Sequence, residues 1–81
     1  MTEPRTLTLI SRAYCHLCRE MEAALQPLLT EYDVTLEVRD ADADPALASY
    51  DEWVPVLLMG KTELCHYFLD EAAVRTALAG G

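Results

Sequence analysis

The sequence lacks long hydrophobic runs and has few basic residues. No apolar stretch approaches the roughly 20 residues that a membrane-spanning helix needs. Six Lys and Arg residues stand against fourteen Asp and Glu residues, for a net charge of −8. That balance argues against binding to nucleic acid or to an anionic membrane, since both need a positive surface. The N-terminus has no basic region followed by a long apolar segment, so we expect a soluble, cytoplasmic protein.

Cysteine is also scarce. Three cysteines are too few for a disulfide-stabilised scaffold, and their odd number fits a reducing compartment. In such a compartment a C-x-x-C pair, here Cys15 and Cys18, is typical of redox catalysis or of metal binding. The chain has 81 residues and no linker or repeat, so we expect one domain over residues 1–81 and a monomer.

The pattern of hydrophobic residues predicts an α/β fold. A β-rich run over 7–11 comes before the cysteine pair, and apolar residues at helical spacing predict a helix from 15 or 16 to 32. Alternation over 34–38 predicts a second strand, parallel to the first. The remaining elements are expected to be a short helix capped by Asp44, strands over 54–59 and 63–67, and a last helix that starts at Asp70.

The position of Cys15 at the start of the first helix favours a reactive thiolate. Unpaired N–H groups and aligned peptide dipoles favour a negative charge there, which lowers the pKa of a thiol. Cys18 lies one turn later and can resolve a mixed disulfide. Arg12, Tyr14 and His16 flank the pair. A cationic Arg12 or His16 would stabilise the thiolate further, and the alternative is that both are exposed residues without such a role.

A metal site is the alternative use of the cysteines. Cys15, Cys18, Cys65 and His66 could supply four ligands. Zinc ribbons carry two C-x-x-C pairs, however, and this chain has one. The residues therefore favour a dithiol, with Cys65 as a buried small hydrophobic residue.

Val54-Pro55 is the second informative feature. Proline is tolerated at the first residue of a strand, and this strand start should lie beside the end of the first strand, near Cys15. A cis peptide bond would turn the backbone groups of Val54 outward, toward an extended peptide that carries a thiol. An ordinary trans proline is the alternative, which the residues alone slightly favour.

The combination of Cys15-His16-Leu17-Cys18, Asp40-Ala41-Asp42 and Val54-Pro55-Val56-Leu57 resembles the glutaredoxins of the thioredoxin superfamily. It is most similar to a group of short bacterial glutaredoxin-like proteins, and the resemblance covers nearly the whole chain. It implies a thioredoxin-like fold of glutaredoxin type, with a four-stranded mixed sheet in the order 2-1-3-4 flanked by helices. It also implies a nucleophile at Cys15, a resolving thiol at Cys18 and a cis Pro55.

The resemblance bears on the thiol partner as well. It implies that glutathione would dock between the cysteines, Val54 and the region of Asp70. Cys65 and His66 stand roughly where glutaredoxins have two glycines, so we expect their side chains to crowd glutathione.

We therefore expect a thiol–disulfide oxidoreductase without a bound cofactor. Its substrate would be a disulfide-containing protein or a small thiol, and its electron donor glutathione or, more readily, a protein reductant. A non-catalytic binding module with the same fold is the alternative.

Overall fold

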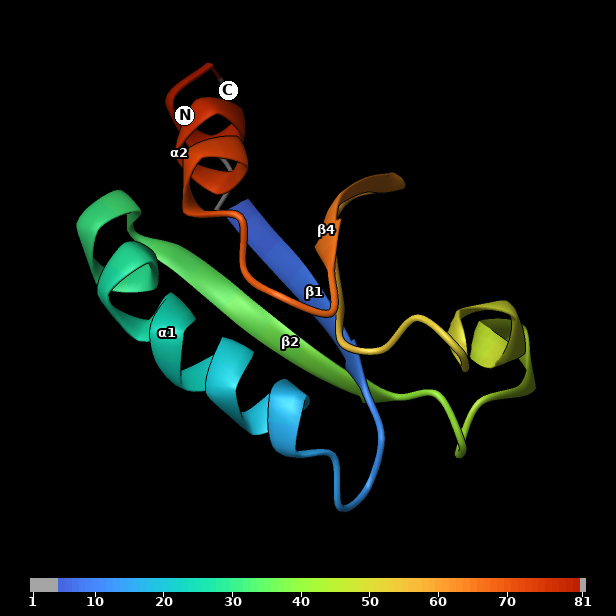
Figure 1. Ribbon diagram of the computed structural model, residues 1–81. Helices are drawn as coiled ribbons and strands as arrows, with labels where there is room; N and C mark the ends of the chain where they lie inside the picture. The colour runs from blue at the N-terminus through green and yellow to red at the C-terminus, as the bar shows by residue number, and fades with distance from the viewer. Residues whose placement is uncertain (1–4, 81) are drawn as a thin grey trace.

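The computed structural model describes residues 5–80, in which a four-stranded sheet carries helices on both faces (Figure 1). The elements in chain order are β1 (Arg5–Ser11), α1 (His16–Tyr32), β2 (Val34–Asp40), the 3₁₀-helix η1 (Pro45–Tyr50), β3 (Val56–Met59), β4 (Thr62–His66) and α2 (Glu71–Gly80). Residues 1–4 and 81, which the expected single domain includes, lie outside the described residues. No helix among residues 5–80 has the length and apolar character needed to cross a membrane.

The strand order is β2-β1-β3-β4, which confirms the predicted sheet. β1 and β2 are parallel and joined through α1, whereas β3 pairs antiparallel with both β1 and β4. In the register, Ile10 of β1 lies opposite Val56 of β3, and Val56 lies opposite His66 of β4. The C-terminal ends of β1 and β4 and the N-terminal end of β3 therefore lie side by side at one end of the sheet. The cysteine pair follows β1 in the chain.

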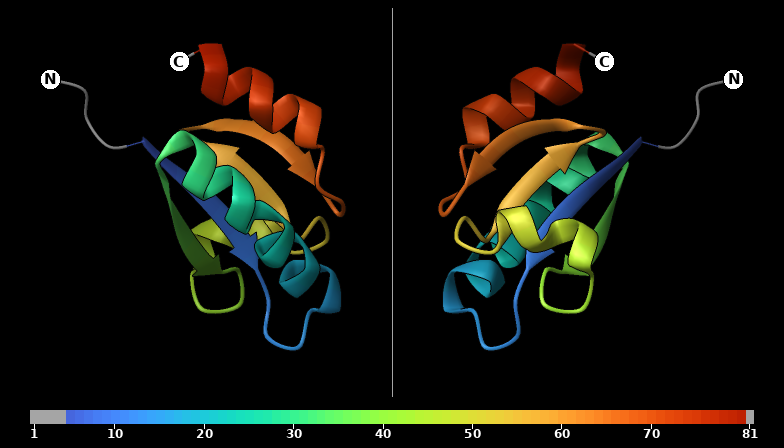
Figure 2. Two further views of the ribbon diagram at one scale, coloured as in Figure 1. Left: turned by 90° about the vertical axis from the view of Figure 1, so that its left-hand side faces the viewer. Right: turned by 90° about the vertical axis from the view of Figure 1, so that its right-hand side faces the viewer.

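Two hydrophobic layers enclose the sheet. α1 and α2 cover one face, and η1 covers the other, as the two views of Figure 2 show. The core under the α-helices contains Leu7, Leu9, Met21, Leu25, Leu28, Val34, Leu57, Cys65, Val74 and Leu78. The smaller core under η1 contains Ile10, Ala41, Val56 and Leu58. Successive residues of β1 and β3 alternate between the two cores, as the pleat of a strand requires.

Side-chain caps define the helix starts that the sequence predicts. The Asp44 carboxylate accepts a hydrogen bond from the N–H of Ala46 at 3.0 Å and opens η1, a 3₁₀-helix. The Asp70 carboxylate accepts one from the N–H of Ala73 at 3.0 Å, so Asp70 caps α2 and the helix itself begins at Glu71.

Strand boundaries differ from the prediction by one or two residues at five places. β1 begins at Arg5, β2 ends at Asp40 and β4 begins at Thr62, each just outside the predicted range. β3 begins at Val56 instead of Val54, because Pro55 has no N–H to donate to a neighbouring strand. The Val54–Pro55 peptide bond is cis. β4 ends at His66, because the backbone of Tyr67 turns into the left-handed region with φ 63°. The segment between β4 and α2 therefore starts one residue earlier than the sequence pattern indicates.

Candidate active site

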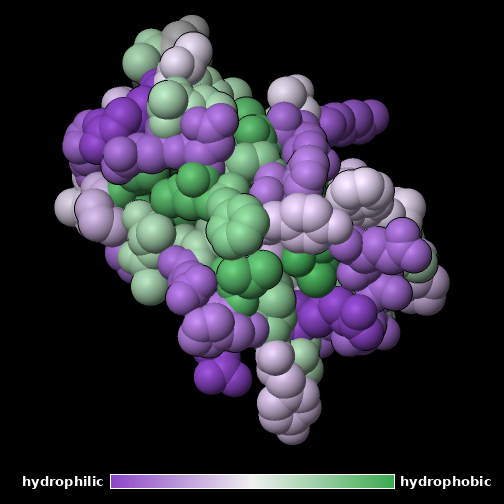
Figure 3. Space-filling view, in the orientation of Figure 1, coloured by the Kyte–Doolittle hydropathy of each residue, from purple (hydrophilic) through white to green (hydrophobic). Residues whose placement is uncertain are grey.

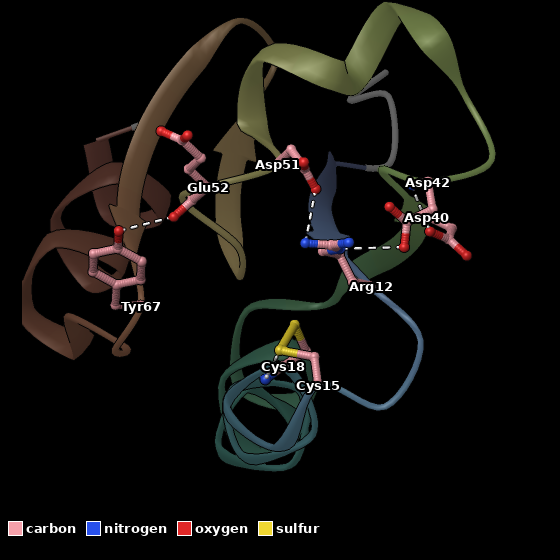
Figure 4. A network of polar contacts seen from close by, with 8 residues as sticks. All are labelled: Arg12, Cys15, Cys18, Asp40, Asp42, Asp51, Glu52 and Tyr67. Carbon is pink, nitrogen blue, oxygen red and sulfur yellow. Dashed lines mark hydrogen bonds and ion pairs between the residues drawn. A yellow bond between two sulfur atoms is a disulfide. The ribbon is translucent and has the colours of Figure 1, made fainter.

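The cysteine pair lies where β1 passes into α1 (Figure 4). Cys15 precedes the first turn of α1 in an extended conformation, and its Sγ accepts a hydrogen bond from the N–H of Cys18 at 3.2 Å. The two residues form a disulfide, with their Cα atoms 5.2 Å apart. Cys15 thus takes the helix-capping role that Ser or Asp usually has. Its sulfur faces the unpaired N–H groups at the start of the helix, where a negative charge is favoured.

The two cysteines differ in accessibility. Cys18 is only 4% exposed, whereas Cys15 is half-buried. Cys15 is therefore the more accessible residue of the pair. This asymmetry fits a nucleophile at Cys15 and a resolving thiol at Cys18, the roles that the spacing predicts.

Arg12 forms two ion pairs across the loops beside the disulfide. Its Nε lies 3.2 Å from Oδ2 of Asp42, and its Nη1 lies 2.9 Å from Oδ1 of Asp51 (Figure 4). The hydrogen bond and the charge of Asp42 raise the pKa of the Arg12 guanidinium. The charge of Arg12 is thus matched by two carboxylates, and its main effect is to tie the loop before Cys15 to the loops on either side of η1.

The other two flanking residues lie on the surface. The His16 side chain is 83% exposed, and its Nε2 lies 3.1 Å from Oε1 of Glu20, one turn along α1. Tyr14 is exposed and adopts a positive φ of 62° in the turn between β1 and α1. The role of His16 in stabilising the thiolate stays a prediction, as does a supporting role for Tyr14.

The Val54–Pro55 segment lies at the same edge of the sheet as the disulfide. Because Ile10 pairs antiparallel with Val56, Pro55 lies level with Ser11, the last residue of β1. Pro55 is buried, and its carbonyl accepts a hydrogen bond from the N–H of Tyr67 at 2.9 Å. Val54 is half-buried and packs on the core under η1.

The structure corrects the expected crowding by Cys65. Its side chain packs into the core under the α-helices, and burial raises the pKa of its thiol. A side chain in this position cannot obstruct a ligand at the surface. His66 is exposed on the η1 side of the sheet. The other exposed side chains in this region belong to Tyr67 and Phe68, which the sequence analysis did not select. The left-handed backbone of Tyr67, a conformation that favours glycine, was not predictable because the pattern placed Tyr67 within a strand.

The four proposed metal ligands are not brought together. Cys15 and Cys18 are bonded to each other, Cys65 faces the α-helices, and the side chain of His66 borders a hollow that Ser49 and Tyr50 of η1 also line. No group of three or more potential ligands forms within residues 5–80. The alternative of a four-ligand metal site therefore has no geometric support.

An apolar hollow lies beside the first turns of α1. It has a volume of about 150 Å³ and is lined by Leu17, Glu20, Met21, Ala24, Tyr67, Phe68 and Leu69. Figure 3 shows a band of hydrophobic surface across the middle of this face, bordered by hydrophilic surface. Asp70, which was expected to lie near a thiol ligand, directly follows the lining residue Leu69 in the chain, but its carboxylate caps α2.

Comparison with known families identifies this arrangement. Residues 6–79 match the model of the Glutaredoxin-like domain (DUF836). The chain belongs to this glutaredoxin-like family. It is also 40% identical to protein Ne2328 from Nitrosomonas europaea, whose solution NMR structure superposes with a TM-score of 0.82 over 95% of this chain and 94% of that one.

Two more distant structures show the fold alone. A malarial protein is 21% identical, with a TM-score of 0.62 over 96% of each chain. Thioredoxin 1 from Thermosipho africanus TCF52B is 18% identical, with a TM-score of 0.57 over 91% of this chain and 86% of that one. The search of curated proteins gave no match. The glutaredoxin-like domain thus has the thioredoxin-like α/β fold that its motifs imply.

Proposed function

We propose that this glutaredoxin-like protein is a thiol–disulfide oxidoreductase in which Cys15 attacks and Cys18 resolves. The observation that carries the proposal is the environment of Cys15. Cys15 is half-buried and its sulfur accepts a hydrogen bond from the N–H of Cys18 at the start of α1, while Cys18 itself is buried. A helix N-terminus stabilises the thiolate, which is the attacking form in thiol–disulfide exchange.

The reaction transfers two electrons from the dithiol to the substrate. The Cys15 thiolate attacks one sulfur of the substrate disulfide, and the other sulfur leaves as a thiolate that takes up a proton. The Cys18 thiolate then attacks the sulfur of Cys15, releases the second substrate thiol and leaves the Cys15–Cys18 disulfide. An external thiol reductant restores the dithiol by the reverse exchange.

The Val54–Pro55 segment supports a polypeptide substrate. It lies level with the end of β1 and next to the loop that carries Cys15. An extended peptide can pair with the backbone of Val54 by strand addition and so present its sulfur to Cys15. We further propose that the protein acts as a cytoplasmic monomer on disulfide-containing proteins or small thiols, with glutathione or a protein reductant as electron donor.

Trapping of the mixed disulfide tests the assignment of roles. The Cys18→Ser variant keeps the nucleophile but cannot resolve the intermediate, so a peptide disulfide should leave one peptide attached to Cys15, visible by intact mass. The Cys15→Ser variant should trap far less, because Cys18 is buried. Cys65→Ser is the matched control and should turn over without trapping.

Two outcomes would contradict the proposal. Trapping by Cys15→Ser instead of Cys18→Ser would reverse the roles of the two cysteines. A wild-type chain that binds the peptide but never reduces it would favour the non-catalytic binding module.

A further inference from the structure

A second, larger hollow lies on the η1 side of the sheet. It has a volume of about 350 Å³ and is lined by Ser49, Tyr50, Trp53, Glu63 and His66. Trp53 is 46% exposed, and its ring contacts the imidazole of His66 edge-on, with 5.4 Å between the ring centroids. The catalytic steps described above use none of these side chains.

An irregularity in β4 brings Glu63 and His66 to the same face. In a regular strand, residues three apart point to opposite faces. Here the pairing with β3 shifts between Leu57 and Leu58, so that Leu57 faces Cys65 while Leu58 faces Glu63. This β-bulge turns both Glu63 and His66 toward the η1 side, where Oε2 of Glu63 lies 3.1 Å from Nδ1 of His66.

The segment that carries Trp53 is held at both sides. Arg12 binds Asp51, and the hydroxyl of Tyr67 donates a hydrogen bond to the carbonyl of Glu52 at 2.8 Å (Figure 4). The ring of Tyr67 also lies against that of Trp53, with 5.9 Å between the centroids. The indole is therefore positioned before any ligand arrives, which reduces the entropy that binding would cost.

The chemistry of the hollow suits a cation. Aromatic rings attract a cationic group through the negative potential of their faces, most strongly for Trp. A carboxylate has two oxygens, and the contact with His66 occupies only one oxygen of Glu63. Among the described residues that line the hollow, Glu63 is the only Asp, Glu, Lys or Arg, and the whole chain carries a formal charge of −8.

The hollow also adjoins the segment proposed to pair with the substrate. Trp53 directly precedes Val54, and His66 lies two strands away from Ile10, near the end of β1. Two strand spacings amount to roughly 10 Å, which an extended peptide covers in about three residues. A peptide paired with Val54 can thus place a side chain in the hollow while its cysteine meets Cys15.

We infer that the hollow binds a Lys or Arg side chain of the substrate polypeptide, about three residues from the reactive cysteine. The inference rests on the proposed function and adds the substrate class: disulfides in a basic sequence context. Charge complementarity and the exposed indole beside the peptide-pairing segment support this occupant.

Matched peptide disulfides test the inference. Each peptide carries Arg, neutral citrulline or Glu at one position two to five residues from the cysteine, on either side, and kcat/KM for its reduction is measured. Citrulline has nearly the shape of Arg without the charge. At the best position we expect Arg to exceed citrulline by about fivefold or more, a factor within the range of one cation–π contact plus an ion pair.

Two variants locate the effect. Glu63→Gln keeps a hydrogen-bonding side chain beside His66 but removes the charge, and Trp53→Leu removes the aromatic ring. Each should lower the Arg-to-citrulline ratio toward one, because each removes one of the two interactions with the cation. Glu37→Gln removes the same charge from β2, at the opposite edge of the sheet, and should leave the ratio as in the wild type.

The outcomes separate this inference from the proposed function. Equal reduction of the Arg and citrulline peptides at every position would overturn the inference and leave the oxidoreductase intact. If Glu37→Gln lowers the Arg-to-citrulline ratio as much as Glu63→Gln does, the inference is also overturned. The preference for Arg would then come from the net charge of the protein. Failure to reduce any of the peptides would instead count against the proposed function.

Discussion

Reduction of the Cys15–Cys18 disulfide should change the stability of the protein by an amount that depends on pH. Two effects oppose each other. The disulfide constrains the unfolded chain, which favours the oxidised protein. On the proposed function, the cap at the start of α1 stabilises a Cys15 thiolate, which would favour the folded reduced protein once the thiol ionises.

The first effect is small because the loop is short. The bonded residues are separated by 3 positions. Closing a loop of this size removes an unfolded-state entropy equivalent to about 2 kcal/mol at room temperature. In the absence of the thiolate, the reduced protein should be less stable than the oxidised protein by about this amount.

The second effect is of similar size. A hydrogen bond to a charged group contributes about 1.5–3 kcal/mol, and a charge at a helix N-terminus about 0.3–1 kcal/mol. Cys15 is half-buried, so solvent screening reduces the sum, and we take about 1.5–2.5 kcal/mol. On the proposed function, the cap favours the ionised form of Cys15 more in the folded state than in the unfolded chain. Its stabilisation is therefore complete above the pKa of the unfolded thiol and is lost as the pH falls through the folded pKa.

Urea unfolding of the oxidised and reduced protein at pH 5 and pH 8 measures both effects. We expect the reduced protein to be about 2 kcal/mol less stable at pH 5, and the difference to shrink by about 1–2 kcal/mol at pH 8. Cys65 is a free thiol in both forms, so its raised pKa cancels in the difference. The Cys15→Ser variant lacks the capping thiol. The difference in its free energy of unfolding from that of the oxidised wild type should therefore not become smaller between pH 5 and pH 8. A difference that stays constant between the two pH values would refute thiolate stabilisation by the cap.

Two further predictions concern the core and the electron donor. Leu25→Ala should lower the free energy of unfolding by about 2–5 kcal/mol, because Leu25 is fully buried between α1 and the sheet. Glu22→Ala, exposed on the same helix, should change it by less than about 0.5 kcal/mol; a loss below about 1 kcal/mol for Leu25→Ala would contradict the packing described above. With glutathione as the only reductant we expect slow turnover that accelerates as salt rises, because the anionic tripeptide meets a chain with a net charge of −8. Efficient turnover at low salt, slowed by added salt, would show that this repulsion does not control the reaction.

Most helices and strands were predicted because helical spacing and capping residues are visible within short stretches of sequence. Helical spacing and a cap at each end define α1, which runs from His16 to Tyr32 with Asp33 in the left-handed conformation at its C-terminus. Asp44 followed by Pro45 predicted a short helix, but could not distinguish an α-helix from the observed 3₁₀-helix. The end of β4 was misplaced because Tyr67 has strong β propensity and its turn is imposed by contacts with Pro55 and Glu52.

The order of elements, the place of Cys15 at a helix start and the overall acidity can be read from the sequence, since periodicity, capping residues and charge are properties of short segments. The partners of these residues depend on how the elements pack against one another. Arg12 meets Asp42 and Asp51 because three loops converge at one edge of the sheet. Cys65 points into the core, and Glu63 and His66 share a face, because a bulge shifts the alternation of β4. A one-residue shift in pairing depends on the neighbouring strand, so no pattern within β4 itself reveals it.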